Sequence, residues 1–323
     1  YNLIIKRGAL ARAAQLAHLN RRVMVVSDSG VPRKMVDAML RQCPQGHCFI
    51  FPQGEASKTP EVGRALLSQL LQAGFDRHDA IVALGGGVVS DVAGYAAAGY
   101  MRGIEWLQFP TTTTAQMDAC LGGKVALNLD GVKNIVGTLH HPRLVVADPN
   151  ALKSLPQRHF TAGLAEALKV ALLGDGDLFG LLETGNIAEN LERILFLALQ
   201  YKKNLVEGDV LDQGPRRLLN FGHTIGYGLE AAGRGALLHG ECVALGMLPM
   251  IESRALLRRT RAVMKKLGLP LKHHMDPDTV LRYIALGKNR EDTRYTVARV
   301  KALGQGYLET VDFDELALLV KGE

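Results

Sequence analysis

The sequence has no long uninterrupted apolar run. A helix that crosses a membrane needs about 20 consecutive, mostly apolar residues. The longest candidate, residues 88–101, is interrupted by Asp91 and by glycines. The first residues also lack the basic and apolar regions of a signal peptide. We therefore expect no membrane partner.

Cysteine is scarce. The four cysteines, Cys43, Cys48, Cys120 and Cys242, are spread over 323 residues without a tight spacing pattern. Too few bridges are possible to staple a chain of this size, so a disulfide framework is excluded and a reducing compartment is expected. The predicted location is the cytoplasm.

Aromatic residues are also few, at 6%, with one Trp. Lys and Arg number 38 against 32 Asp and Glu, a net charge of +6, but the basic pairs are scattered and no aromatic residues are interleaved with them. We therefore expect no nucleic-acid partner. An anionic small molecule and a merely solvated basic surface both remain possible explanations of the charge.

Apolar runs and helical patterns alternate in the first half of the chain. Strands are predicted at 22–27, 48–51, 80–84, 104–109 and 143–147, with helices beginning near Pro32 and after the loop 53–58. This alternation is typical of an α/β domain with a mostly parallel sheet, placed at residues 1–150. In residues 151–323 helical periods dominate, at 162–173, 188–206, 240–258 and 280–286, which predicts an all-α second domain.

A glycine triplet follows the central strand 80–84. Gly85, Gly86 and Gly87 would let a phosphate approach bare backbone N–H groups, and Ser90 or Asp91 could cap the helix that follows. The alternative is a tight turn. The carboxyl end of a central strand favours nucleotide or phosphate binding, although the spacing is not the G-x-G-x-x-G of ordinary Rossmann dehydrogenases.

Polar residues cluster again at 110–134. Four threonines after Pro110 precede Asp118, Lys124, Lys133 and Asn134, with glycines between them. Lysines beside glycines suit an anion site, and surface lysines are the alternative.

The second half contains residues of the metal-binding type. Glu166 and Lys169 share one face of a predicted helix, while His223 and His239 lie near the starts of two others. Their spacing is no recognised zinc signature, so structural histidines remain an alternative to a metal site.

Five runs, in this order, resemble the 3-dehydroquinate synthase family of sugar phosphate cyclases: GGGVVSDVAGYAAAGYMRG, PTTTTAQMDACLGGKVALNLDGVKNIVG, GLAEALK, RRLLNFGHTIGYGLE and LLHGECVALGM. The resemblance implies a Rossmann-like NAD-binding domain followed by a helical metal-binding domain. It also implies a divalent ion, Zn²⁺ or Co²⁺, and a homodimer.

Individual residues carry this resemblance. Glu166, His223 and His239 match the metal ligands. The positions that match NAD contacts are Glu55, Lys58, Gly85, Gly86, Gly87, Val88, Val89, Ser90, Asp91, Thr111, Thr112, Lys124, Lys133, Ala151, Leu152, Lys153 and Ser154. Those that match the substrate pocket are Arg102, Asp118, Asn134, Lys169, Lys202, Arg216, Asn220 and Lys288. In the family the arginine matched by Arg102 reaches the neighbouring subunit's site.

The implied activity is a phosphate-eliminating carbon–oxygen lyase of the shikimate pathway, which makes aromatic amino acids. An anionic phosphorylated sugar acid, 3-deoxy-D-arabino-heptulosonate 7-phosphate, would become 3-dehydroquinate and phosphate, with NAD regenerated in each turnover. The chain departs from the family where Tyr227 replaces the second histidine of GHTxGH, and in the run around Lys288.

Three alternatives remain. A related cyclase such as a 2-deoxy-scyllo-inosose synthase would bind a sugar phosphate that lacks the carboxylate; Tyr227 favours it, whereas Arg216 and Asn220 suit a carboxylate. A metal-dependent polyol dehydrogenase would release NADH, and the Lys and Asn residues suited to phosphate disfavour it. An inactive binding protein would retain its ligands without releasing phosphate.

Overall fold

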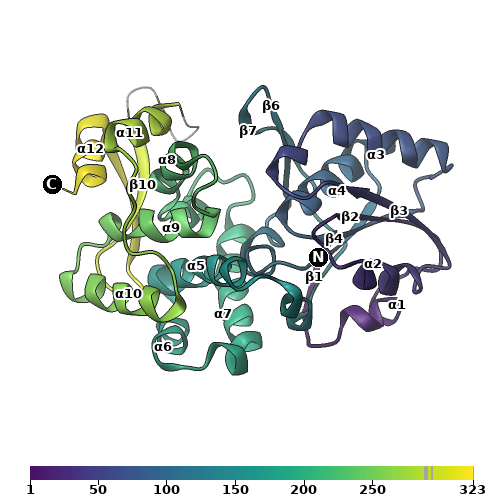
Figure 1. Ribbon diagram of the computed structural model, residues 1–323, viewed down its shortest axis with the longest axis horizontal. Helices are drawn as coiled ribbons and strands as arrows, with labels where there is room; N and C mark the ends of the chain where they lie inside the picture. The colour runs from purple at the N-terminus through teal and green to yellow at the C-terminus, as the bar shows by residue number, and fades with distance from the viewer. Residues whose placement is uncertain (287–289, 292–293, 323) are drawn as a thin grey trace. The chain divides into compact units, whose positions relative to one another are not determined.

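The computed structural model describes residues 1–286, 290–291 and 294–322. The chain divides into two compact units, Tyr1–Leu155 and Pro156–Glu323. Each unit has its own architecture (Figure 1).

The first unit is built on a six-stranded sheet with the strand order β1-β8-β5-β4-β2-β3. All neighbouring strands run parallel, so the predicted parallel sheet is confirmed. Its strands are β1 (Asn2–Ile5), β2 (Arg22–Asp28), β3 (Gln45–Phe51), β4 (Ala80–Gly85), β5 (Glu105–Pro110) and β8 (Leu144–Ala147). The chain begins at one edge, crosses to β3 at the other, and returns to β4 in the middle.

Helices cover both faces of this sheet: α1 (Ala13–Leu16) and α2 (Arg33–Leu40) on one, α3 (Pro60–Gln72) and α4 (Gly87–Gly99) on the other (Figure 1). Side chains alternate between the faces along each strand. In β2, Met24 and Val26 pack with α3 and α4, whereas Val23 and Val25 pack with α1 and α2. Central strands with two buried faces explain the continuous apolar runs in the sequence.

The polar region 110–134, predicted to bind an anion, lies in a segment that includes regular structure. A π-helical turn, η4 (Ala115–Ala119), follows β5, and β6 (Lys124–Leu129) and β7 (Val132–Leu139) then form an antiparallel hairpin. The sequence pattern missed this hairpin because β7 is exposed along most of its length and shows no clear alternation.

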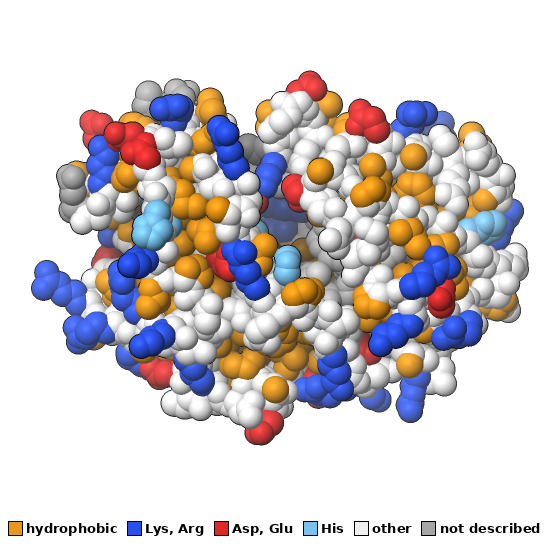
Figure 2. Space-filling view, in the orientation of Figure 1, with side chains coloured by type: hydrophobic (Ala, Val, Ile, Leu, Met, Phe, Trp, Pro, Cys, Tyr) orange, Lys and Arg blue, Asp and Glu red, His pale blue; other side chains and the backbone are white. Residues whose placement is uncertain are grey.

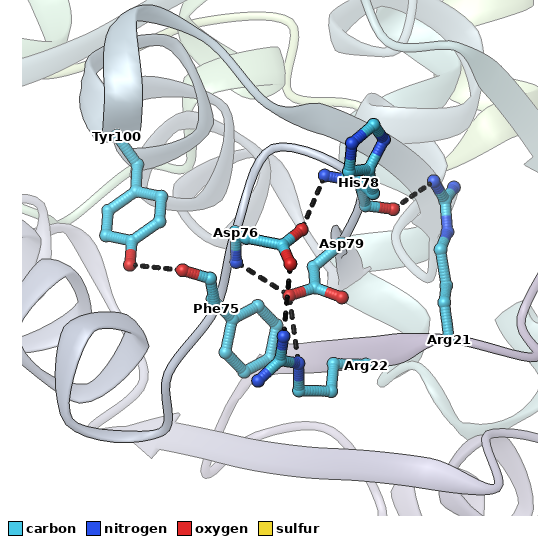
Figure 3. A network of polar contacts seen from close by, with 7 residues as sticks. All are labelled: Arg21, Arg22, Phe75, Asp76, His78, Asp79 and Tyr100. Carbon is cyan, nitrogen blue, oxygen red and sulfur yellow. Dashed lines mark hydrogen bonds and ion pairs between the residues drawn. The ribbon is translucent and has the colours of Figure 1, made fainter.

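A polar network holds the amino ends of the strands (Figure 3). Arg22, the first residue of β2, contacts the carboxylates of Asp76 at 3.2 Å and Asp79 at 3.0 Å. The Tyr100 hydroxyl donates to the carbonyl of Phe75 at 2.9 Å. The α3–β4 connection is therefore fixed at the end of the sheet opposite its carboxyl edge.

The second unit is mainly helical, as predicted. Its helices are α5 (Gln157–Gly174), α6 (Gly176–Thr184), α7 (Ile187–Gly208), α8 (His223–Gly233), α9 (His239–Met247), α10 (Arg254–Leu267), α11 (Pro277–Ala285) and α12 (Phe313–Lys321). Beyond the expected all-α unit, it contains an antiparallel sheet of β9 (Arg290–Glu291), β10 (Arg294–Val300) and β11 (Gly306–Asp312). Tyr295 and Val297 are buried on one face of β10, and Ala298 and Val300 on the other. The sequence analysis did not recognise this short strand.

The single helix predicted at 240–258 is wrong. Helix α9 ends at Met247, the turn η7 (Leu248–Met250) contains Pro249, and α10 begins only at Arg254. Proline removes a helical hydrogen bond, and the Ser253 hydroxyl caps α10 by accepting from the N–H of Leu256 at 3.3 Å.

Within the residues that the structure describes, no helix has the length and apolarity needed to cross a membrane. On the face seen in Figure 2, Lys and Arg side chains are scattered among acidic and apolar ones rather than gathered in one stripe.

Candidate functional site

The predicted nucleotide site in the first unit lies at the carboxyl edge of its sheet. Gly85 ends β4, a strand that pairs with both β2 and β5. The chain reverses its direction of travel across the sheet at this strand, which is where open α/β sheets bind ligands. Helix α4 begins at Gly87, so the first N–H groups of a helix face this edge.

The three glycines have different reasons to be glycine. A Cβ on Gly85 would lie 2.4 Å from Val89, and one on Gly86 would lie 3.0 Å from Thr112, so both positions are packed. A Cβ on Gly87 would meet no atom within 4 Å. The space over Gly87 can therefore admit a phosphate close to the backbone.

The prediction that Ser90 or Asp91 caps this helix is wrong. The N-cap is Gly86, without a side-chain cap, because α4 starts earlier than the sequence suggested. The Ser90 hydroxyl lies within the first turn, donates to the Gly86 carbonyl at 3.2 Å and accepts from Gln108 at 2.7 Å. Gln108, which the sequence analysis missed, thus holds the glycine loop from β5.

The other predicted NAD positions of this edge lie after neighbouring strands. The Thr111 N–H donates to the Gly85 carbonyl at 2.9 Å, which fixes the end of β5 beside the loop. Residues 151–154 lie in the turn η5 (Pro149–Ser154), directly after β8. The buried Gln116 amide donates to the carbonyls of Pro110 and Asp148, and so ties the ends of β5 and β8 together.

Lys58 is the centre of a polar cluster. It is 6% exposed, its ammonium lies 2.5 Å from Asp91, and it also bonds to the Asn134 side chain. Burial raises the pKa of the Asp91 carboxyl, and the Lys58 charge opposes that shift. The structure therefore brings together Lys58, Asp91 and Asn134, which the resemblance had divided between cofactor and substrate.

Four other predicted residues of the first unit are more exposed than Lys58. Lys124 and Lys133 lie on the hairpin, and Asp118 lies on η4. Arg102 follows α4 with a positive φ of 68° and lines a surface hollow with Trp106, His140 and Arg143.

In the second unit, Glu166, His223 and His239 converge. One ligand atom from each lies within 4.8 Å of the others. The Nε2 atoms of both histidines lie 3.8 Å from Glu166 Oε1. Ligands bound to one zinc ion at about 2.0–2.2 Å are about 3–4 Å apart. This predicted ligand set therefore fits a divalent ion.

Glycines allow this convergence. A Cβ on Gly240 of α9 would lie 1.9 Å from the Ala162 carbonyl of α5. One on Gly246 would lie 2.1 Å from the Gly222 carbonyl before α8. Because no side chain could fit at either contact, α9 packs directly on its two neighbours, each of which supplies a ligand.

Contacts behind the ligands orient them. His239 Nδ1 bonds to the Glu230 carboxylate at 2.9 Å, and His223 Nδ1 lies 3.2 Å from the Phe221 carbonyl. Each contact engages the nitrogen away from Glu166, as is usual for metal-binding histidines. The ring of Tyr227, 47% exposed, lies 5.5 Å from that of His223 and 5.9 Å from that of His239.

Three buried basic residues belong to the same unit as these metal ligands. Lys169, 1% exposed, places its ammonium 2.6 Å from Glu166 Oε2. Lys202 and Arg216 are also buried, and Asn220 ends the turn η6 (Pro215–Asn220) just before the His223 helix. Lys288 lies outside the described residues. The positive charge of these side chains suits an anionic ligand.

Asp209 shapes the loop before Arg216. Its carboxylate accepts from the N–H groups of Gln213, Gly214 and Arg216 at 2.7–3.2 Å. These backbone bonds lower the pKa of Asp209. The Arg216 guanidinium in turn donates to the Val210 carbonyl at 2.8 Å.

Solved structures with the same architecture define the class. A 2-deoxy-scyllo-inosose synthase complexed with carbaglucose-6-phosphate, NAD⁺ and Co²⁺ matches with a TM-score of 0.90 and 26% identity, covering 99% of this chain and 96% of that one. A 2-epi-5-epi-valiolone synthase from Streptomyces hygroscopicus subsp. jinggangensis 5008, with NAD⁺ and Zn²⁺ bound, matches with a TM-score of 0.90 and 28% identity, covering 100% and 97%. The fold is thus that of the sugar phosphate cyclases.

Sequence comparison defines the family within that class. The models for the N-terminal and C-terminal parts of 3-dehydroquinate synthase match residues 48–162 and 163–290. The 3-dehydroquinate synthase of Lactococcus lactis subsp. cremoris (strain MG1363) is 36% identical over 344 residues, covering 99% of this chain and 97% of that protein. The chain belongs to the 3-dehydroquinate synthase family.

Proposed function

We propose that this protein is a 3-dehydroquinate synthase, which converts 3-deoxy-D-arabino-heptulosonate 7-phosphate to 3-dehydroquinate and phosphate. The convergence of Glu166, His223 and His239 beside the buried Lys169 supports this function most directly, in a chain of this family. A carboxylate with two oriented imidazoles leaves room on a zinc ion for substrate oxygens.

The two cofactors would be held by separate groups of residues. NAD fits the edge formed by Gly85–Gly87, Thr111, Thr112 and residues 151–154, and Zn²⁺ or Co²⁺ fits the Glu166 centre. When bound, NAD supplies a reversible hydride acceptor and the ion a Lewis acid that acidifies a ring hydroxyl.

The chain's own residues prepare this chemistry. Lys169 pairs with one oxygen of Glu166 and leaves the other directed at the two imidazoles. Glu230 and the Phe221 carbonyl fix the rings, so the ligands need little reorganisation when the ion enters.

Basic and amide groups would bind the substrate's two anionic ends. Arg216 and Asn220 suit the carboxylate, because a guanidinium can donate two parallel hydrogen bonds to it. In the second unit, Lys202 suits the phosphate. In the first unit, Asn134 and Asp118 match the family's substrate positions, and Lys124 and Lys133 match its NAD positions. The positive charge of these groups complements the two anionic groups of the substrate.

We further propose a homodimer in which Arg102 contributes to the neighbouring subunit's site. Its exposed position after α4 and its left-handed backbone support a specialised role. All four cysteines are free, which supports a cytoplasmic location.

One observation favours an alternative function, that of another sugar phosphate cyclase. Tyr227 stands beside both histidines where the family has another histidine, so a carboxylate-free sugar phosphate is the alternative substrate. Arg216, buried and positioned by its loop, would then lack an anionic partner from the substrate.

One assay separates these functions. The zinc-loaded protein is incubated with NAD and the heptulosonate phosphate, and phosphate, 3-dehydroquinate and free NADH are measured. We expect phosphate and 3-dehydroquinate in equal amounts and no accumulation of NADH. Turnover of glucose 6-phosphate instead would identify the alternative cyclase, and stoichiometric NADH a dehydrogenase.

A metal-site variant gives the matched test. His239→Ala should lower zinc occupancy and turnover together, because it removes one of three protein ligands. His274→Ala, which removes an exposed histidine of the same unit, is the control. Normal zinc content in the His239 variant would contradict the metal assignment.

A further inference from the structure

Asn128 makes contacts that its sequence context does not suggest. It lies on β6 at the register shift between Leu127 and Leu129, where the β6–β7 ladder is interrupted. Its N–H donates to the Lys58 carbonyl at 2.8 Å, and its side-chain amide donates to Glu55 at 2.9 Å. Its amide oxygen accepts from the N–H of Asn134 at 2.9 Å.

These bonds join the segment that carries Lys58 to the segment that carries its partner Asn134. One segment is the turn 55–58, and the other is the start of β7, where Asn134 has a positive φ of 54°. Asparagine tolerates this left-handed backbone, but the side chain reaches Lys58 only if the conformation is kept. The bond from Asn134 N–H to Asn128 keeps it.

A turn-closing role alone does not explain this pattern. A residue that merely closes the hairpin needs bonds within residues 124–139, whereas two of the bonds of Asn128 go to Lys58 and Glu55. The side chain must also accept on one side and donate on the other. At this length only an amide does both, since a carboxylate accepts only and an aliphatic group does neither.

We propose that Asn128 is a positioning residue for NAD binding. It sets Glu55 and Lys58 on the cofactor side and Asn134 on the hairpin side in one arrangement. This inference rests on the proposed NAD site. Asn128 would act through Glu55, Lys58 and Asn134 and not by touching the cofactor itself.

The test uses two variants of the zinc-loaded full chain and titration with NAD in a calorimeter. Asn128→Asp keeps the acceptor for Asn134 but loses the donor to Glu55 and sets two carboxylates against each other. We expect NAD to bind about tenfold more weakly, with turnover at saturating NAD changed less than affinity. Asn190→Asp, an equal charge change on the surface of α7, should leave NAD affinity unchanged.

A double variant tests the route through Glu55. Glu55→Gln restores a donor opposite the introduced carboxylate, so N128D/E55Q should bind NAD no more weakly than N128D alone, although E55Q by itself costs affinity. Additive losses would overturn the proposal.

Two further controls distinguish a loss of NAD affinity from a failure to fold and from an error in the proposed function. If N128D unfolds, Asn128→Ala, which adds no charge, carries the same expectation with its melting temperature measured beside it. Native NAD affinity in folded N128D or N128A would overturn the proposal. A wild-type chain that does not bind NAD would instead contradict the proposed function.

Discussion

Arg158 at the start of α5 donates two hydrogen bonds to Glu241 at the start of α9, each at 2.7 Å. Glu241 also accepts from the N–H of Leu238, the N-cap residue three positions before it, at 2.8 Å. Because α5 carries Glu166 and α9 carries His239, this pair holds two metal-ligand helices in register without touching the ion.

We therefore expect Glu241→Gln to weaken metal binding without removing a ligand. The neutral amide cannot accept both Arg158 bonds, and charged two-point pairs are the stronger kind. The zinc dissociation constant should rise about tenfold, within the 10–100-fold range for outer-shell partners. Competition with a chromophoric chelator measures it, and an unchanged constant would show that helix packing alone sets the site.

A substitution at Gly87 tests the proposed NAD site more directly than a substitution at Gly85 or Gly86. Gly86→Val would press on Thr112 as well as on a ligand, whereas Gly87→Ala places a methyl group in open space. We expect folding to be unaffected and NAD affinity to fall about tenfold or more, since the backbone can no longer be approached closely.

Gly99→Ala is the matched control for this change. Gly99 lies at the other end of α4, and its Cβ would also meet no atom within 4 Å. Equal NAD affinity in the two variants, measured by calorimetry, would make the loop over Gly87 structural only.

The network of Figure 3 should contribute to stability rather than to binding. Asp79 is 5% exposed, pairs with Arg22 and accepts from the N–H of Asp76 at 2.7 Å. Asp79→Ala leaves the partly buried N–H of Asp76 and the Arg22 guanidinium without this partner, which should cost about 1–3 kcal/mol of unfolding free energy. Asp37→Ala removes an exposed pair with Arg33 and should cost below about 0.5 kcal/mol in the same urea titration.

The ion pair between Glu183 and Arg259 should make the stability of the protein depend on pH. Arg259 donates two bonds of 2.8 Å to it and lowers the pKa of its carboxyl below the ordinary 4.5. The stabilisation is thus complete above about pH 4.5 and is lost as the pH falls through the lower, folded value. The stability difference between the wild type and Glu183→Gln should therefore shrink in acid. Glu207→Gln, on an exposed pair, should show little difference at any pH. A difference for Glu183 that stays constant as the pH falls through the folded pKa of Glu183 would show that the charge of the pair is irrelevant.

Part of the fold and of the site could be predicted from the sequence. Physical features of particular residues explain why the rest could not. Strand β4 is buried on both faces and therefore has an unbroken apolar run. Strand β7 is mostly exposed and has no pattern to recognise. The spacing of Glu166, His223 and His239 gave no metal signature, because their convergence depends on close helix contacts at Gly240 and Gly246. From the sequence, only the resemblance to the family's motifs assigned these three residues to one metal site.

Tyr227 is the clearest departure from the family, and its ring packs on both imidazole ligands. It lies one helical turn after His223 on α8, so a change at 227 acts on the site without altering the ligand set. Tyr227→Phe keeps the ring and should retain zinc affinity, whereas Tyr227→Ala removes the packing of that ring on both imidazoles and should weaken zinc binding several-fold. Equal zinc affinity in these two variants would mean that the ring has no part in orienting the ligands.

Tyr227→His then tests the reaction itself. Tyrosine can donate a hydrogen bond but is not cationic at neutral pH, and a positioned acid or base typically contributes about a hundredfold to ten-thousandfold in rate. If the substrate's own phosphate serves as the base for its elimination, residue 227 only adjusts how protons and the ring are handled. We therefore expect turnover of the heptulosonate phosphate to rise or to stay near its native value, with a modest effect on zinc content. A native protein that ignores this substrate and cyclises a carboxylate-free sugar phosphate would mark Tyr227 as a specificity residue of the alternative cyclase.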